Sequence, residues 1–387
     1  MHSGFALLQL VSALCLGGSA LGCLYLLIAA ATVLRFLRRD LPPAAVAAPP
    51  AITILKPLHG AEPNLARRLR AYCEQDYEAP TQIIFGLQAR HDAAVEIAEA
   101  VARSVPHAEL VIGTRRRGTN PKISNLLNLL PHARHDVLVI ADSDIEVGPD
   151  YLKNLAAELD RPEVGAVSCL YHGVANGGAW AKLAALAITS HFLPNAVLAL
   201  NWHLAQPCFG ATIALRRAVL TRIGGLEAFA DSLADDYEIG TAVRAAGYQV
   251  AVPGFTVGHV CFERSLGELF AHDLRAARTI KNIDPLGYYG AVITHPLPLA
   301  LLGLPAYGSG ALWLAVLALA CRIALCLSVA TTCKLGHQPY WLVPFRDLLS
   351  FAVFVRSLFG GTVGWRGASY RVSWSGRLMP DRTEAEP

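Results

Sequence analysis

The stretch Asp136-Val-Leu-Val-Ile-Ala-Asp-Ser-Asp144 decides the fold class of this chain. Its apolar residues, 137–141, include three β-branched side chains and are typical of a strand buried on both faces of a sheet. Asp142 and Asp144 follow, and residues two apart in an extended segment point to the same side, so both carboxylates can converge on one hard cation. Because ligands of open α/β sheets bind beyond the carboxyl ends of strands, the pair is a candidate metal site. A turn capped by Asp gives the same pattern.

The composition indicates a mixture of membrane and soluble parts. The chain has 387 residues, of which 53% are hydrophobic and 16% are charged. This length suffices for about two domains, and the composition is too apolar for an ordinary soluble protein. A formal net charge of +3 gives no indication of nucleic acid as a partner. The nine cysteines include no Cys-x-x-Cys pair, which argues against a disulfide framework and a zinc site and fits a reducing compartment.

The N-terminal segment, 1–40, is expected to anchor the chain in a membrane. Residues 5–34 are almost wholly apolar and long enough to cross a bilayer as a helix. A cleaved signal peptide is the alternative, but no Lys or Arg precedes the run, which is also longer than a signal core. Arg35, Arg38 and Arg39 follow it, so the positive-inside rule predicts an outside N-terminus and a cytosolic position for what comes next. A Pro/Ala linker ends at residue 50.

Strand and helix patterns alternate through 51–284, which predicts an α/β domain with a parallel, Rossmann-like sheet covered by helices. The predicted strands are 51–55, 83–87, 110–112, 137–141, 164–170, 209–216 and 250–252. The predicted helices are 64–74, 93–104, 122–130, 149–159 and 233–246, followed by an amphipathic helix over 265–280.

Three further segments are apolar. Residues 179–204 are interrupted by Lys182, several other polar residues and Pro194. We therefore expect a half-buried or interfacial helical pair that lines a pocket for an apolar substrate. The region 285–360 predicts two spans, 291–307 and 311–331, that are broken at 308–310, and a weaker, interfacial stretch at 342–359. The arginines of the tail, 361–387, favour the cytosol.

The acidic residues of the α/β domain suit different steps of one reaction. A nucleotide-sugar donor carries a diphosphate whose departure needs charge neutralisation, which a divalent cation on Asp142 and Asp144 would supply. Asp92 follows an early strand and can hold the uracil or ribose. Asp236 can take the proton from an attacking hydroxyl. Structural alternatives exist, because Asp92 can cap the helix after it, and Asp235 or Asp236 can cap 233–246.

Several basic residues also have two interpretations. Arg275 and Arg278 lie three apart on one helix face, where they can clamp phosphate oxygens or form a solvated surface. Lys122, at a helix start, can contact phosphate or be exposed. His259 follows a strand and is more often a structural histidine than a metal ligand.

A set of motifs resembles the ceramide glucosyltransferase family, and more narrowly its bacterial hopanoid-biosynthesis branch. The resemblance covers nearly the whole chain, and several motifs in the same order are far more specific than one. They are Lys56-Pro57-Leu58-His59-Gly60, Asn120-x-Lys122-x-Ser124-Asn125-Leu126, Asp142-Ser143-Asp144, Ala234-Asp235-Asp236-Tyr237, Arg275-x-x-Arg278 and Trp365-Arg366-Gly367-x-x-Tyr370-Arg371.

The resemblance implies a GT-A type catalytic domain, a UDP-sugar donor, an inverting transfer and a lipid acceptor. The family's first acidic position falls on Asp92, its metal-binding motif for Mg²⁺ or Mn²⁺ on 142–144, and its catalytic base on Asp236. Lys122 and Asp235 are further candidates for substrate binding.

The family's last motif ends in Trp, but Thr279 follows Arg278 here. This departure disfavours ceramide glucosylation and is compatible with the hopanoid branch, which by resemblance uses UDP-N-acetylglucosamine and bacteriohopanetetrol. The resemblance therefore predicts an enzyme of a bacterial inner membrane with its catalytic domain facing the cytosol. Ceramide glucosyltransferase, with UDP-glucose as donor, is the alternative. A transporter or scaffold would need its polar residues within the spans, whereas the acidic residues here gather in the soluble part.

Overall fold

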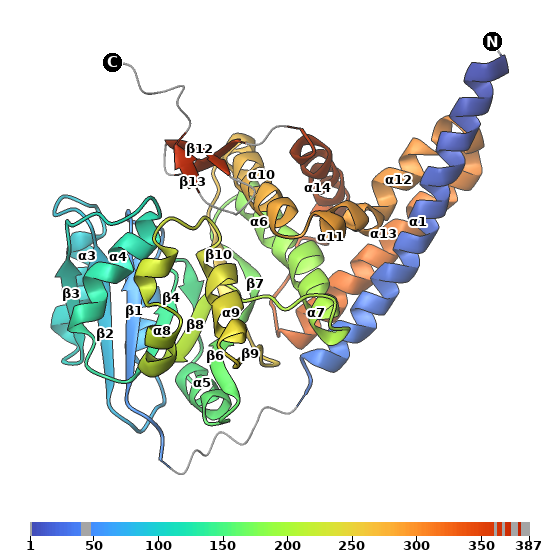
Figure 1. Ribbon diagram of the computed structural model, residues 1–387. Coiled ribbons are helices and arrows are strands. Elements are labelled where there is room, and N and C mark those ends of the chain that lie inside the picture. Colours follow the sequence, from blue (N-terminus) through green and yellow to red (C-terminus); the bar gives the residue numbers. More distant parts are fainter. Residues whose placement is uncertain (1, 40–47, 360–361, 366–367, 373–377, 381–387) are drawn as a thin grey trace, which may run out of the picture.

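The computed structural model describes residues 2–39, 48–359, 362–365, 368–372 and 378–380. An α/β domain lies on one side of the molecule, and a group of apolar helices, α1, α12 and α13, projects from it (Figure 1). Helices α10, α11 and α14 lie between the two parts. The predicted α/β class is therefore confirmed.

The main sheet has seven strands in the order β3-β2-β1-β4-β8-β6-β9. Strands β1 to β4 are parallel to one another, whereas β8 is antiparallel to both β4 and β6, so the sheet is mixed rather than wholly parallel. The strands are β1 (Ile52–Pro57), β2 (Thr81–Leu87), β3 (Ala108–Ile112), β4 (Val137–Ala141), β6 (Val164–Ser168), β8 (Thr212–Arg216) and β9 (Gln249–Ala251).

Helices cover both faces of this sheet. Val137 and Val139 pack on the face covered by α2 (Leu65–Cys73), α3 (Val95–Ser104) and α5 (Tyr151–Leu159). Leu138 and Ile140 pack on the opposite face, and every residue of β4 is buried, as its apolar run predicts. The opposite face is covered by α4 (Pro121–Leu129), α8 (Arg217–Arg222) and α9 (Asp235–Ala245).

A second, three-stranded sheet lies beyond the carboxyl end of β4. Its order is β5-β10-β7, formed by Ile145–Glu146, Thr256–Cys261 and Leu170–Ala175. The predicted strand 164–170 is in fact divided between β6 and β7, and β5 and β10 were not predicted. Since β5 follows Asp144 at once and pairs with β10, this sheet brings His259 next to the Asp-Ser-Asp segment.

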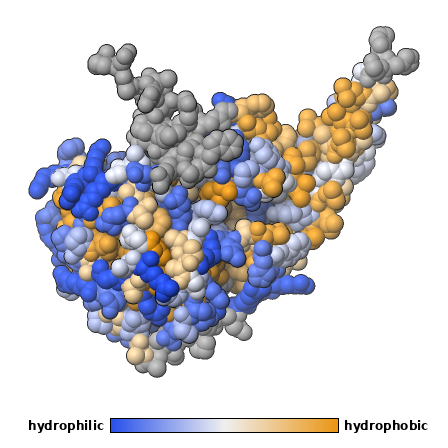
Figure 2. Space-filling model, in the orientation of Figure 1, coloured by the Kyte–Doolittle hydropathy of each residue, from blue (hydrophilic) through white to orange (hydrophobic). Residues whose placement is uncertain are grey.

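Three helices among the described residues are long and apolar enough to cross a membrane: Gly4–Phe36, Ala179–Asn201 and Leu304–Thr332. Figure 2 shows the hydrophobic surface concentrated on the projecting helices, whereas the α/β domain is mostly hydrophilic outside. The predicted N-terminal helix is α1 (His2–Phe36). The predicted break at 308–310 is a kink at Gly308 (φ 45°, ψ −116°) within α13 (Leu304–Thr332). A positive φ of this kind favours glycine.

Residues 179–201 form one continuous helical path rather than a pair broken at Pro194. The path consists of α6 (Ala179–Ala187), a π-helical turn (Ile188–Phe192) and α7 (Leu193–Asn201). More than half of its apolar window is buried inside the protein, as a half-buried helix requires. The π-turn accommodates Pro194, which has no N–H to donate to the carbonyl of Ser190 four residues earlier.

The C-terminal region continues through helices α10 to α14. Outside the described residues lie 366–367, which include part of the Trp-Arg-Gly motif. The helices are α10 (Leu266–Ile283), α11 (Pro285–Gly290), α12 (Pro296–Leu302), α13 and α14 (Val343–Ser357), and the described tail has three short strands, Thr362–Trp365, Ala368–Val372 and Leu378–Pro380.

One buried arginine joins four of these segments. Arg322 of α13 is 1% exposed, and its Nε lies 3.0 Å from the carboxylate of Asp347 in α14. It also donates to the carbonyls of Ser190, at 2.7 Å, and of Thr294. The carbonyl of Ser190 stands four residues before Pro194 and therefore lacks its usual helical donor. Arg322 supplies that hydrogen bond and also donates to the carbonyl of Thr294, just before the N-cap of α12.

Candidate active site

Two buried cations hold the backbone of the Asp-Ser-Asp segment. Lys56 Nζ donates to the carbonyl oxygen of Asp142 at 2.6 Å, and Arg68 Nε donates to that of Ser143 at 3.1 Å. Both side chains are at most 1% exposed. Glu62 joins them, because its carboxylate accepts from Arg68 at 2.5 Å and from Ser143 Oγ at 2.5 Å. Sequence reasoning missed Arg68 and Glu62, and recorded Lys56 only as part of a motif.

Lys122 connects two of the predicted carboxylates. Its Nζ lies 2.8 Å from Asp142 Oδ1 and 3.5 Å from Asp235 Oδ2. Burial alone would lower the pKa of Lys122, but the carboxylates of Asp142, Asp235 and Asp236 outweigh burial and raise it, so the side chain stays cationic. Burial also raises the pKa of Asp142, against the attraction of Lys122.

Asn120 fixes this arrangement from the start of α4. Its Oδ1 accepts the N–H groups of Lys122 and Ile123, which is an N-cap that leads into Pro121 at the first helical position. Its Nδ2 donates to Asp235 Oδ1 at 3.1 Å and to the carbonyl of Ser232. Asp235 is therefore held by Asn120 and Lys122 rather than by helix capping, since α9 has no side-chain cap.

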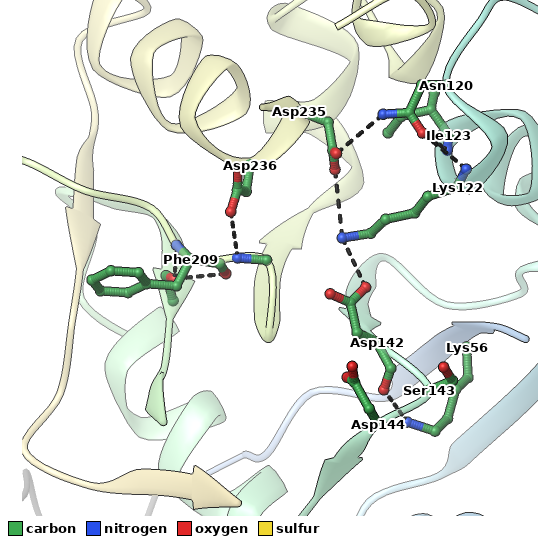
Figure 3. Close-up of polar contacts among 12 residues, drawn as sticks. Lys56, Asn120, Lys122, Ile123, Asp142, Ser143, Asp144, Phe209, Asp235 and Asp236 are labelled. Atoms are coloured by element: carbon green, nitrogen blue, oxygen red, sulfur yellow. Dashed lines mark hydrogen bonds and ion pairs between the residues drawn. The ribbon is translucent and has the colours of Figure 1, made fainter. Parts of the chain in front are cut away.

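The side chains of Asp236 and Asp142 both approach Gly210. Asp236 Oδ2 accepts the N–H of Gly210 at 2.7 Å, and its Oδ1 accepts the N–H of Tyr237 at 2.8 Å. A Cβ built on Gly210 would lie 3.1 Å from Asp236 Oδ2, 3.3 Å from Lys122 Nζ and 3.4 Å from Asp142 Oδ2. Four segments distant in sequence thus surround one small volume (Figure 3).

The surroundings of Asp236 suit a general base. Burial, together with the negative charge of Asp235, raises its pKa to about 6, while Lys122 and the N–H of Tyr237 act in the opposite direction. A carboxylate with such a pKa is mostly ionised at neutral pH and is still a stronger proton acceptor than an ordinary Asp.

Gly210→Ala should disturb this volume without disturbing the fold. The new Cβ would meet only the ends of three side chains, at 3.1 to 3.4 Å, so these ends must shift by a fraction of an ångström. We expect a loss of transfer rate of about 10 to 100-fold, because small displacements of reacting groups are costly. Gly148→Ala is the control, since nothing lies within 4 Å of its Cβ. Equal rates for both variants in a sugar-transfer assay, with unchanged melting temperatures, would contradict the assignment.

Asp144 offers an oxygen that the protein leaves without a hydrogen bond. Its Oδ1 is buried and has no hydrogen-bond partner among the described residues, and His259 Nδ1 lies 3.8 Å away. Burial lowers the pKa of Arg275, and the charge of Asp144 partly opposes this shift. Unpaired carboxylate oxygens of this kind suit Mg²⁺ or Mn²⁺.

The described residues do not form an enclosed metal site. Within the part of the chain that the structure describes, no group of three His, Cys, Asp or Glu side chains is arranged to hold a metal ion. An ion held by one or two carboxylates and completed by substrate phosphates and water fits this open arrangement.

Two predicted residues have contacts outside this volume. Both carboxylate oxygens of Asp92 accept the N–H of Gly60, at 2.9 and 3.1 Å, and Oδ1 also accepts that of Ala94 at 2.8 Å. Asp92 thus ties the loop after β1 to the start of α3, close to the capping role that we considered. Arg278 Nη2 donates to the carbonyl of Phe359, just after α14, at 3.1 Å.

An aromatic cluster, which sequence reasoning missed, borders the site. The ring of Tyr171 stacks on Phe192 with centroids 4.3 Å apart, and it also contacts Phe209 and His259. Phe209 precedes Gly210, His259 neighbours Asp144, and Phe192 belongs to the π-turn of the apolar helix. The cluster therefore connects the carboxylates with the half-buried helix.

Comparisons with known proteins identify the family of this chain. Residues 15–378 match the family described as Glycosyl transferase family 21. Ceramide glucosyltransferase 1 of Caenorhabditis elegans is 23% identical over 353 residues, which cover 86% of this chain and 74% of that relative. Ceramide glucosyltransferase of Komagataella phaffii is 30% identical over 116 residues, or 28% of this chain and 23% of the relative.

A solved structure confirms the predicted GT-A fold. The mannosyltransferase PcManGT from Pyrobaculum calidifontis, in complex with GDP-Man and Mn²⁺, has a TM-score of 0.52 at 24% identity and covers 90% of this chain and 99% of its own. Since the family match extends over most of the sequence, through the α/β domain and the apolar helices alike, this protein belongs to glycosyl transferase family 21.

Proposed function

We propose that this protein transfers a sugar from a UDP-sugar to a hydroxyl group of a membrane lipid, with inversion at the anomeric carbon. Its family makes it a nucleotide-sugar-dependent glycosyltransferase with apolar, membrane-associated helices. The observation that carries the proposal is the convergence of Asp236 Oδ2 and Asp142 Oδ2 on Gly210, which sets a candidate base beside a candidate metal ligand.

In this mechanism Asp236 removes the proton of the acceptor hydroxyl while the hydroxyl oxygen attacks the anomeric carbon in line. The bond from that carbon to the diphosphate breaks, and UDP departs on the opposite side. The N–H groups of Gly210 and Tyr237 keep the carboxylate of Asp236 oriented. A fixed base and a fixed donor convert an encounter of two reactants into a reaction within one complex.

Asp142 and Asp144 would hold Mg²⁺ or Mn²⁺, which when bound supplies positive charge to the departing diphosphate. The free oxygen of Asp144 and the Mn²⁺ named with the structurally similar mannosyltransferase support this assignment. Lys56 and Arg68 contribute by fixing the backbone that carries the two carboxylates. Chelation should therefore weaken UDP binding, which calorimetry measures independently of turnover.

Five further residues would bind the donor. Asp92 is assigned to the nucleoside, and Lys122 and Asp235 form the ion-paired wall beside Asp142. Arg275 and Arg278 would add positive charge at the diphosphate. For Arg275 the electrostatic influence of Asp144 supports this role. For Arg278 the support is its place in the motif.

The acceptor would be bacteriohopanetetrol and the donor UDP-N-acetylglucosamine. The apolar path from the bilayer along 179–201 to the Tyr171 cluster suits a lipid whose hydroxyl end reaches Asp236. Thr279, in place of the motif's Trp, favours the hopanoid over ceramide. Ceramide with UDP-glucose is the second candidate, because the curated relatives are ceramide glucosyltransferases. The protein would lie in a bacterial inner membrane with the α/β domain in the cytosol, on the side of Arg35, Arg38 and Arg39.

The two candidates are separated by one assay of the purified full chain in lipid nanodiscs. Bacteriohopanetetrol and ceramide are each offered with UDP-N-acetylglucosamine and with UDP-glucose, and products are identified by mass spectrometry. We expect glycosylated bacteriohopanetetrol from UDP-N-acetylglucosamine, little product from the other pairs, and loss of product on chelation that Mg²⁺ or Mn²⁺ restores. Glucosylceramide as the main product would show that the second candidate is right.

A further inference from the structure

A cavity of about 430 Å³ lies where the cytosol-facing end of α1 meets the end of α7, apart from the carboxylates of the active site. It is lined by Ile28, Ala31, Thr32, Arg35, Arg39, Asn201 and Trp202. This volume is within the usual range for small-molecule sites. Neither the proposed reaction nor the family motifs involve these residues.

The polar side of the cavity is positively charged. Arg35 lies in the last turn of α1, Arg39 lies three residues beyond the end of α1 at Phe36, and both contribute to the lining. Arg39 is fixed in place, because its Nη2 donates to Asn201 Oδ1 at 2.7 Å and its guanidinium lies 4.8 Å from the ring centre of Phe36. Among the residues that the structure describes, no carboxylate lines the cavity or pairs with Arg35. Two guanidinium groups that line one cavity are suited to phosphate oxygens.

The apolar side of the cavity continues onto the lipid-facing surface of α1. Residues 24, 28, 31 and 35 of α1 follow at spacings of three or four and therefore share one helix face. Leu24 and Leu27, at the outer end of this face, are 55% and 50% exposed. Leu27 and Arg35 are about 12 Å apart along the helix axis. This is roughly the distance in a bilayer from the acyl chains to the headgroups.

Trp202 marks the same level from the other helix. It is 50% exposed and lies at the end of α7, beside Asn201. Exposed Trp side chains concentrate where hydrocarbon gives way to headgroups, because the indole ring has an apolar body and a polar N–H. The cavity is thus lined by two arginines, is bordered by Trp202 and continues along apolar residues of α1 toward the bilayer. The two helices that form it, α1 and α7, are in contact (Figure 1).

We propose that this cavity binds one anionic phospholipid. The phosphate would be held between Arg35 and Arg39, and an acyl chain would lie along the face that carries Ile28 and Leu24. Basic pockets between membrane helices on the cytoplasmic side recognise anionic headgroups in this manner. The bound lipid would fill the gap between α1 and α7, and so join the N-terminal helix to the helix that borders the active site.

The proposal is tested on the full chain with dioleoyl phosphatidylglycerol as the probe. Native mass spectrometry counts the lipid molecules retained by the protein. Dibromo-phosphatidylglycerol quenches the fluorescence of nearby Trp side chains, and the difference in quenching between the parental protein and Trp202→Phe gives the contribution of Trp202. We expect one tightly retained lipid, Trp202 quenching, and an affinity about five to tenfold lower in Arg35→Ala, given about 1 kcal/mol per basic residue near an anionic surface.

Arg38→Ala is the matched control, because Arg38 is an exposed neighbour, two residues after the end of α1, that does not line the cavity. Ala31→Trp fills the cavity and leaves both arginines, so it should also displace the lipid. An equal loss of lipid affinity in Arg38→Ala and Arg35→Ala would show a non-specific electrostatic attraction and overturn the proposal. Displacement of the lipid by inorganic phosphate at equal concentration would overturn the lipid assignment in favour of a free phosphate ligand.

Discussion

Asp236→Asn should lower the transfer rate about 1,000-fold while the affinity for UDP stays within a few-fold of the parental value. The amide cannot accept the proton of the acceptor hydroxyl, and a positioned general base contributes on the order of 100 to 10,000-fold. The size of the side chain and the contact with Gly210 are retained, since the amide oxygen can still accept that N–H. Rates come from product formation at saturating donor, and affinity comes from calorimetry.

The pH profile supplies an independent check of the same assignment. The pKa of Asp236 is raised to about 6, so the parental rate should fall as the pH is lowered through 6, where the base becomes protonated. Asp236→Asn should lose this dependence in its residual rate. Glu227→Gln removes the same charge from an exposed position just before α9 and should keep the parental rate and profile. A rate within tenfold of the parental value in Asp236→Asn would exclude the base assignment.

The features that sequence could predict are those with a local cause. The strand β4 is apolar on both faces because it is covered on both, so five residues suffice to recognise it. The kink at Gly308 follows from glycine itself. The pair Asp142 and Asp144 could be found because the carboxyl end of a strand is where such sheets bind ligands.

The features that sequence could not predict depend on partners far along the chain. Strand β5 has only two residues and exists because β10 pairs with it, more than a hundred residues later. The direction of β8 is likewise invisible in its composition. Lys56 and Arg68 are cations and are expected at the surface, yet both are buried against backbone carbonyls of the Asp-Ser-Asp segment.

The candidate site itself was predicted in part. Asp142, Asp144, Asp235 and Asp236 gather with Lys122, and this could be anticipated from motif order alone. Gly210 could not, because a glycine between two short segments carries no signal until the side chains around it are known. The aromatic cluster of Tyr171 was missed for the same reason, since its rings come from β7, β10, the π-turn and the loop before β8, which are far apart in the sequence.

Arg322 shows how a substitution remote from the chemistry can act on the whole molecule. Its guanidinium pairs with the buried carboxylate of Asp347 and donates to the carbonyls of Ser190, which Pro194 leaves without a helical donor, and of Thr294. Arg322→Met should therefore leave one buried carboxylate and two buried carbonyl oxygens without their partner. Breaking a buried pair in this way costs about 3 to 5 kcal/mol, and unsatisfied carbonyls add to the cost.

We expect Arg322→Met to lower the unfolding temperature of the detergent-solubilised chain more than the same substitution of any exposed arginine does. Arg356→Met is the matched control on α14, because that side chain is exposed and, among the residues that the structure describes, donates only to the carbonyl of Phe359. This substitution should change the free energy of unfolding by no more than about 0.5 kcal/mol. Adding Asp347→Leu to Arg322→Met should recover part of the loss, since no buried charge is then left unpaired, although the two carbonyls and the His191 ring, which lies 3.1 Å from Asp347 in the parental protein, lose their partners. If the double variant is no more stable than Arg322→Met, then Asp347 does not depend on Arg322, and the four segments are held together by packing alone.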